Sequence, residues 1–173
     1  MHRDGMQVAG SGQLANPPAV EIRPFQTGED AVAFRTLNEE WITRYFTLEP
    51  MDRENLSDPQ GRILHKGGQI FMAYFGRQAV GCVALIPMHT GVYELSKMAV
   101  APEMRGLGIG RKLLEHAIAE ARRMGAKSLF LGSNSRLQSA VHLYESVGFC
   151  HVPAEQLPEM PYARANVFME LAL

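Results

Sequence analysis

The turn at residues 104–112 constrains the fold most, because it reads Met-Arg-Gly-Leu-Gly-Ile-Gly-Arg-Lys. It follows a strand predicted over 93–100 and opens a helix predicted over 108–124. Such a junction directs several backbone N–H groups and the positive end of the helix dipole at one point. Glycine lets the backbone approach an anion closely, and the flanking Arg and Lys side chains add positive charge. The turn therefore predicts a pyrophosphate-binding site.

Two common nucleotide motifs do not fit this turn. A P-loop needs Gly-Lys-Ser/Thr, whereas Gly110 is followed by Arg-Lys-Leu, with no hydroxyl for a metal ion. The dinucleotide motif places two residues between its second and third glycines. Here Gly106, Gly108 and Gly110 are separated by one residue throughout. Neither nucleotide motif accounts for the turn.

A third pattern does fit. Arg105-x-x-Gly108-x-Gly110 resembles the R/Q-x-x-G-x-G/A signature with which the GNAT N-acetyltransferase superfamily binds the pyrophosphate of acetyl-CoA. Residues 93–102 resemble the fourth strand of that family and its following loop. Residues 140–149 resemble its late helix and closing Gly-Phe. The three blocks occur in the family's order, and the resemblance covers roughly residues 20–171.

The hydrophobic pattern predicts an α/β domain over residues 20–173, preceded by a flexible tail at 1–19. We expect strands at 20–25, 69–75, 79–88, 93–100, 128–131, 149–152 and 167–171. We expect helices at 29–46, 52–64, 108–124 and 137–147, with an interruption at Asp58-Pro59 in the second. This order predicts a mixed, twisted sheet flanked by helices. The resemblance implies a single-domain GNAT-like acyl-CoA N-acyltransferase fold whose sheet is splayed between strands four and five.

Composition agrees with one core and argues against other classes of protein. The chain has 173 residues, 46% of them hydrophobic and 20% charged, and a net charge of −1. This charge gives no field that would attract nucleic acid or a membrane. Cys82 and Cys150 lie in apolar segments, so we expect buried thiols in a reducing cytoplasm. The histidines show no metal-ligand spacing, and no metal is predicted.

The resemblance implies acetyl-CoA as cosubstrate and assigns residues to it. Backbone groups of Met98, Ala99 and Val100 would bind the pantetheine arm, as an unpaired strand edge is able to do; the alternative is simple burial in the sheet. Asn134 ends a strand where family members often have a cofactor-binding asparagine, although the spacing to the next helix departs from the family pattern. An Asx turn is the equal alternative. The diphosphate would lie on Arg105, Gly106, Leu107, Gly108, Ile109, Gly110 and Arg111.

Acetyl transfer to an amine needs a base for the amine proton and an acid for the thiolate. Glu94 is the candidate base, acting through a water, because strand alternation places it on the same face as Met98. The alternative is a solvated strand charge paired with Lys97 or a neighbour. Tyr144 is the candidate acid, since the matching family tyrosine lies near the cofactor sulfur. Its alternative is a packed tyrosine bonded to a carbonyl.

The acceptor wall is expected in the first helices. Trp41, Tyr45 and Phe46 occur there among a run of acids, which suits a cationic amine, although a core stripe with a solvated face fits equally. Tyr162 and Arg164 lie in the last loop, where an arginine would suit an acceptor that also carries a carboxylate. The acceptor class stays open between small amines and peptide amines, and the resemblance admits a homodimer.

Two functions follow from these patterns. The first is an acetyl-CoA-dependent N-acetyltransferase that works by direct attack in a ternary complex, since no cysteine lies in the three blocks. The alternative is a non-catalytic CoA-binding regulatory module on the same fold. A binding module would have no need of Glu94 or Tyr144.

Overall fold

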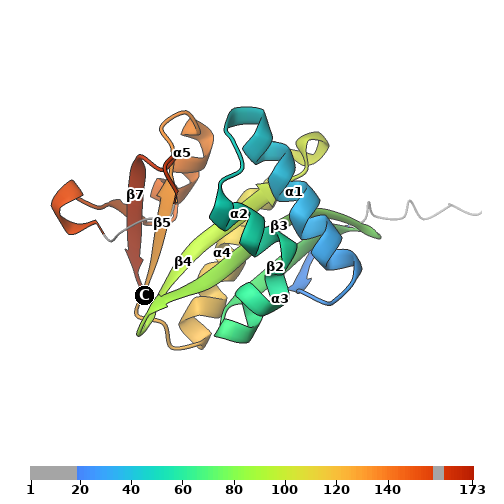
Figure 1. The fold of residues 1–173 in the computed structure, drawn as a ribbon, viewed down its shortest axis with the longest axis horizontal. Coiled ribbons are helices and arrows are strands. Elements are labelled where there is room, and N and C mark those ends of the chain that lie inside the picture. The colour runs from blue at the N-terminus through green and yellow to red at the C-terminus, as the bar shows by residue number, and fades with distance from the viewer. Residues whose placement is uncertain (1–18, 158–161) are drawn as a thin grey trace, which may run out of the picture.

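The computed structural model describes residues 19–157 and 162–173 (Figure 1). In these residues seven strands form one sheet in the order β1-β2-β3-β4-β5-β7-β6. The strands are β1 (Val20–Pro24), β2 (Gln69–Phe75), β3 (Gln78–His89), β4 (Val92–Val100), β5 (Ser128–Ser133), β6 (Cys150–His151) and β7 (Val167–Ala172). The helices are α1 (Glu29–Tyr45), α2 (Pro50–Ser57), α3 (Pro59–Arg62), α4 (Ile109–Arg123) and α5 (Gln138–Ser146). The predicted tail, except for Ala19, lies outside the described residues.

The predicted α/β class and element order are confirmed, with one helix divided. The expected helix at 52–64 separates into α2 and α3 at Asp58, where the sequence predicted an interruption. The Asp58 side chain accepts a hydrogen bond of 3.0 Å from the Gly61 amide, and Pro59 occupies the first position of α3. Both features are typical of a helix start.

The splay between the fourth and fifth strands is confirmed. β4 and β5 are parallel and pair only over Val92–Glu94 and Ser128–Phe130. β4 then continues to Val100 along β3, while β5 continues to Ser133 along β7. The two strands diverge in Figure 1, and α5 lies near the open end of the gap.

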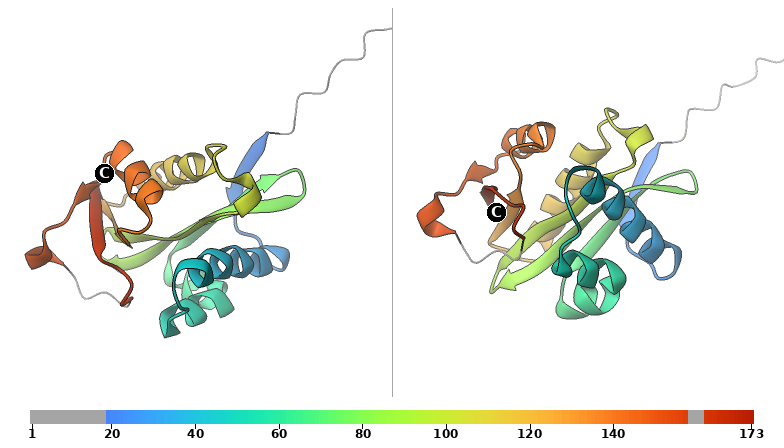
Figure 2. Two further views of the ribbon diagram at one scale, coloured as in Figure 1. Left: turned by 90° about the horizontal axis from the view of Figure 1, so that it is seen from above. Right: turned by 45° about the horizontal axis from the view of Figure 1, so that its top comes forward.

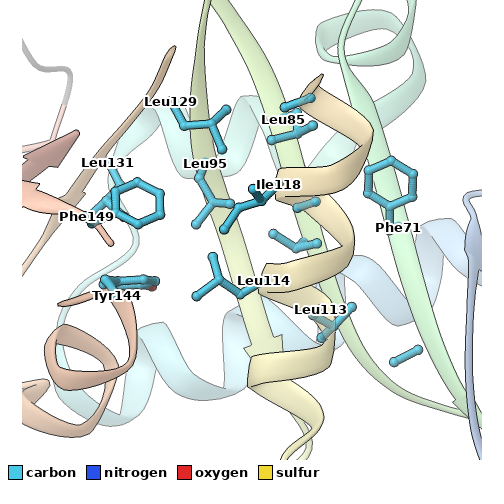
Figure 3. Packing of buried hydrophobic residues seen from close by; sticks show 14 of the residues in the cluster. Phe71, Leu85, Leu95, Leu113, Leu114, Ile118, Leu129, Leu131, Tyr144 and Phe149 are labelled. Carbon is cyan, nitrogen blue, oxygen red and sulfur yellow. The ribbon is translucent and has the colours of Figure 1, made fainter. Parts of the chain in front are cut away.

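Two hydrophobic clusters cover the two faces of the sheet. Figure 2 shows α4 and α5 on one face and α1 to α3 on the other. On the first face Leu113, Leu114 and Ile118 of α4 pack toward Leu95 of β4 (Figure 3). Phe34 and other buried side chains fill the second face. β4 is therefore the central strand of the sheet, with a hydrophobic cluster on each face, and the gap between β4 and β5 opens beside it.

The two cysteines differ from the expectation that both are buried. Cys82 is buried in β3, but Cys150 is exposed. Cys150 lies on β6, an edge strand of two residues that pairs only with β7. Both residues of this strand are exposed. Among the described residues, no helix combines the length and hydropathy needed to cross a membrane.

Candidate active site

The glycine-rich turn forms the start of α4. Gly108 is the N-cap, with φ of 80°, and no side chain caps the helix. Gly106 has the same φ, and a Cβ on either glycine would meet nothing within 4 Å. The start of α4 is therefore open beside both glycines and has no side-chain cap, which fits an anionic ligand.

The unpaired edge of β4 leads from this turn to the middle of the sheet. Because pairing with β5 stops at Glu94, the following residues have no strand on that side. A cavity of about 680 Å³ opens along this edge, between α4, α5 and the C-terminal end of α1. It brings together most of the predicted site residues: Glu94, Met98, Ala99, Val100, Arg105, Gly106, Gly108, Ile109, Gly110, Asn134 and Tyr144.

Two residues predicted at the diphosphate site do not line this cavity. Leu107 is 64% exposed at the tip of the turn. The Arg111 guanidinium donates to Ser146 Oγ at 2.8 Å and lies 3.6 Å from Glu115. Arg105 does line the cavity, and it forms an ion pair of 3.0 Å with Glu40 of α1.

A β-bulge changes the predicted geometry of β4. Ser96 pairs with Ala84 and Ala99 with Cys82, so two residues of β4 oppose one of β3. Lys97, in the bulge, has φ of 52°. The expectation that Glu94 and Met98 share a face is therefore wrong. Met98 packs on the α4 side, whereas Ile86, the partner of Glu94, packs on the α1 side.

Glu94 is half-buried in the cavity wall. Burial raises the pKa of its carboxyl, although the Lys97 charge, a hydrogen bond with Ser96 and the Arg164 charge oppose this shift. A carboxylate with a raised pKa is a stronger base than an ordinary one. The position suits a base that faces the cavity.

Tyr144 is buried, and its ring lies 5.9 Å from that of Phe149 in an edge-on arrangement. Figure 3 shows the two rings together at the end of the cluster nearest α5. Burial raises the pKa of Tyr144 to about 12, so its hydroxyl keeps its proton at neutral pH. No hydrogen bond joins this hydroxyl to another described residue, in contrast to the predicted alternative of a carbonyl partner.

The Asn134 side chain is engaged within the protein. Its Oδ1 accepts from the Arg136 amide at 2.8 Å, which forms the predicted Asx turn. Its Nδ2 donates to the Arg164 carbonyl at 2.7 Å. Asn134 thus fixes the loop before β7 against the end of β5, and its role toward a cofactor stays a prediction.

A buried ionic network lies beside Glu94, and the sequence did not predict it. Lys97 Nζ lies 2.7 Å from Asp52 Oδ1 of α2, and both side chains are almost fully buried. Arg164 donates to both oxygens of Asp52, at 2.6 and 2.8 Å, and to Glu49 at 3.2 Å. The only sequence signal was a lysine among the apolar residues of a central strand.

Tyr162 completes this network. Its hydroxyl oxygen lies 3.0 Å from Lys97 Nζ and 3.4 Å from Asn55 Nδ2. Tyr162 and Arg164 line the cavity, and so does the predicted acceptor wall of Trp41, Tyr45 and Phe46. The described residues contain no group of His, Cys, Asp and Glu side chains suited to a metal ion.

Comparison with known proteins points to one family. A model of the acetyltransferase (GNAT) family matches residues 33–149. An uncharacterized N-acetyltransferase of Schizosaccharomyces pombe is 29% identical over 141 residues, 79% of this chain and 86% of that protein. An IAA acetyltransferase of Azospirillum brasilense is 33% identical over 126 residues, 71% of this chain and 75% of its own length. Other relatives are longer: the chain spans 47% of a mycothiol acetyltransferase of Cellulomonas flavigena, at 28% identity over 89% of this chain.

Solved structures share the fold. A GNAT-family acetyltransferase of Staphylococcus aureus superimposes with a TM-score of 0.81 at 23% identity, covering 89% of this chain and 99% of that one. A GNAT-family acetyltransferase of Elizabethkingia anophelis, solved with acetyl-CoA bound, gives 0.59 at 22% identity and covers 89% and 98% of the two chains.

Proposed function

Because the chain belongs to the acetyltransferase (GNAT) family, we propose that it moves an acetyl group from acetyl-CoA to a primary amine by direct attack in a ternary complex. One observation carries this proposal. The uncapped start of α4, the unpaired edge of β4, Glu94 and Tyr144 all line one continuous cavity. A ligand with a diphosphate at one end and a thioester at the other fits such a cavity.

Binding would use the backbone more than side chains. The diphosphate would accept hydrogen bonds from the N–H groups at the start of α4, in the open space beside Gly106 and Gly108. Arg105 would add positive charge by turning part of its guanidinium from Glu40 to the diphosphate. The pantetheine amides would pair with the β4 edge at Met98, Ala99 and Val100, where β5 has separated.

The chemistry would need two protein groups. A free amine is mostly protonated at neutral pH, so Glu94 would take its proton, through a water, before the nitrogen attacks the thioester carbon. The C–N bond forms as the C–S bond breaks. Tyr144 would donate its proton to the leaving thiolate and recover a proton from the nitrogen, which loses its second one as the amide forms; its raised pKa keeps the hydroxyl protonated at neutral pH. No cysteine lines the cavity within the described part of the chain, in agreement with direct attack.

Acetyl-CoA consumption across a panel of amines tests the proposal. Glu94→Gln and Tyr144→Phe should each lower kcat by about 100-fold or more, the typical contribution of a general acid or base, while CoA binding by calorimetry is unchanged. Glu103→Gln and Tyr93→Phe are matched controls outside the cavity lining. Wild-type turnover in both variants would contradict the assigned roles. CoA binding without transfer to any amine would favour the non-catalytic module.

A further inference from the structure

The hydroxyl group of Tyr162 has a hydrogen that no described residue accepts. Its oxygen is approached by Lys97 Nζ at 3.0 Å and by Asn55 Nδ2 at 3.4 Å. An ammonium group and an amide NH₂ are both donors only. Both neighbours therefore donate to the phenol oxygen, and the O–H hydrogen of Tyr162 is left for another partner.

The surroundings of Tyr162 place its ring at the wall of the cavity. Lys97 Nζ lies 4.4 Å and Arg164 Cζ 4.7 Å from the ring centroid. Cation–π contacts with these two groups therefore fix the position of the ring. Tyr162 is only 8% exposed, and it lines the same cavity as Glu94. With two donors at its oxygen, the hydroxyl hydrogen is available to an acceptor that enters the cavity.

The charges beside Tyr162 favour an uncharged partner. Lys97 is held by Asp52, and Arg164 is held by Asp52 and Glu49. With Glu94, three carboxylates face these two cations. A substrate carboxylate would bring a further negative charge to a largely buried place, where Lys97 and Arg164 already have carboxylate partners. Arg136 also lines the cavity, but its side chain is exposed to solvent, lies over the Phe46 ring and donates to the Tyr45 carbonyl at 3.1 Å.

This charge balance changes the expectation that Arg164 binds a carboxylate of the acceptor. A carbonyl oxygen accepts the Tyr162 hydrogen without adding charge. A buried donor that a substrate leaves unpaired discriminates against that substrate, because the lost hydrogen bond is not replaced by water.

Building on the proposed acetyl transfer, we propose that Tyr162 is a specificity-determining residue whose hydroxyl donates a hydrogen bond to an amide carbonyl next to the acceptor amine. The acceptor then belongs to the α-amino amides: an amino-acid amide or the amino end of a peptide. Its ammonium group lies toward Glu94 and its carbonyl toward Tyr162. Lys97 and Asn55 act as positioning residues, because they occupy the phenol oxygen and leave its hydrogen to the substrate.

The test measures kcat/KM for acceptors that differ only in the carboxamide. The pairs are L-phenylalaninamide with 2-phenylethylamine, and L-leucinamide with 3-methylbutylamine; L-phenylalanine and L-leucine form a third arm. Wild type is compared with Tyr162→Phe, and with Tyr93→Phe as a control tyrosine outside the cavity. The variant-to-wild-type ratio for each acceptor removes differences in amine basicity. Calorimetry with CoA confirms that each variant is folded.

We expect Tyr162→Phe to lower kcat/KM about tenfold for the amides and by less than twofold for the matched amines, since one hydrogen bond is lost. Asn55→Asp supplies a carboxylate that accepts the Tyr162 hydrogen, so it should reproduce this selective loss with the ring in place. The free amino acids should be poorer acceptors than the amides.

Several results would overturn the inference. One is an equal fall in kcat/KM for amides and amines in Tyr162→Phe, and another is no fall in kcat/KM at all. A third is a wild-type protein that acetylates the amines and none of the amides. A wild-type preference for the free amino acids would show that the site binds a carboxylate. Acetyl-CoA binding with no transfer to any amine would instead refute the proposed function itself, and the two failures are thus distinguishable.

Discussion

Asp52→Asn is the sharpest test of the buried network, because it removes a charge and leaves the size of the side chain unchanged. Asp52 accepts from Lys97 at 2.7 Å and from Arg164 at 2.6 and 2.8 Å, and its side chain is fully buried. It also accepts from the Glu49 amide at 2.9 Å in the capping box of α2. An asparagine keeps one acceptor oxygen and loses the partner of two buried cations.

The magnitude follows from the ionisation of Asp52. Burial alone would raise the pKa of this carboxyl, but hydrogen bonds from Arg164 and Lys97 outweigh burial and lower it from 3.8 to about 2. A pKa lowered by folding gives stability that is present above about pH 4 and is lost as the pH falls toward 2. At about 1.4 kcal/mol per unit the shift corresponds to about 2 kcal/mol. Leaving two cations without their partner adds to this, so we expect a loss of about 3 kcal/mol at pH 7.

Urea unfolding at pH 7 measures this loss. The control is Glu54→Gln on the same helix, whose ion pair with Arg62 is 3.5 Å long with both side chains 44% exposed. Such a surface pair contributes about 0–1 kcal/mol. If Asp52→Asn destabilised the protein no more than this control, the network would not be a stabilising feature. The difference in the free energy of unfolding between wild type and Asp52→Asn should also become smaller below pH 4. If this difference stayed constant down to pH 3, the linkage argument would be contradicted.

Three further predictions concern the cavity and the thiols. Gly108→Ala should weaken CoA binding measured by calorimetry and lower stability by about 1–2 kcal/mol, because φ of 80° disfavours a side chain; unchanged affinity would argue against a diphosphate at this turn. The kcat/KM of the wild type should fall as the pH drops through a value above the ordinary range of a glutamate, since burial raises the pKa of Glu94 and the base must be ionised; a profile of Glu94→Gln with the same acid limb would exclude Glu94 as its source. In thiol labelling Cys150 should react at once, whereas Cys82, whose pKa burial raises to about 12, should react only on unfolding; rapid labelling of both would show that β3 is open to solvent.

The sequence predicted the helix α4 well because each local feature agreed with the tertiary structure. Leu113, Leu114 and Ile118 recur at helical spacing, and all three are buried against the sheet. Gly108 marks the start of the helix, and Gly125, with φ of 78°, follows its end. Patterns of this kind depend on neighbouring residues, so they are visible without knowledge of the partner strands.

The same reasoning did not predict the bulge in β4. Strand alternation predicts Glu94 and Met98 on one face, and it fails because an extra residue at Lys97 reverses the faces beyond it. Leu95, Lys97 and Ala99 are nevertheless all buried, as a period of two requires. Periodicity therefore predicted which residues are inside, but not which layer of the molecule each one contacts.

The network around Asp52 shows what a lysine in a central strand implies. A buried ammonium needs a carboxylate, so the burial of Lys97 between Leu95 and Ala99 requires an ion pair with some acid of the chain. The sequence offers many acids, and only the packing of α2 on the sheet selects Asp52, which is 45 residues away. Arg164 joins from 112 residues away because Asn134 fixes its loop against β5. This network is thus built from contacts between distant segments, whereas the edge of β4, the glycine-rich turn and α4 follow one another in sequence. The sequence therefore predicted these consecutive elements better than it predicted the network.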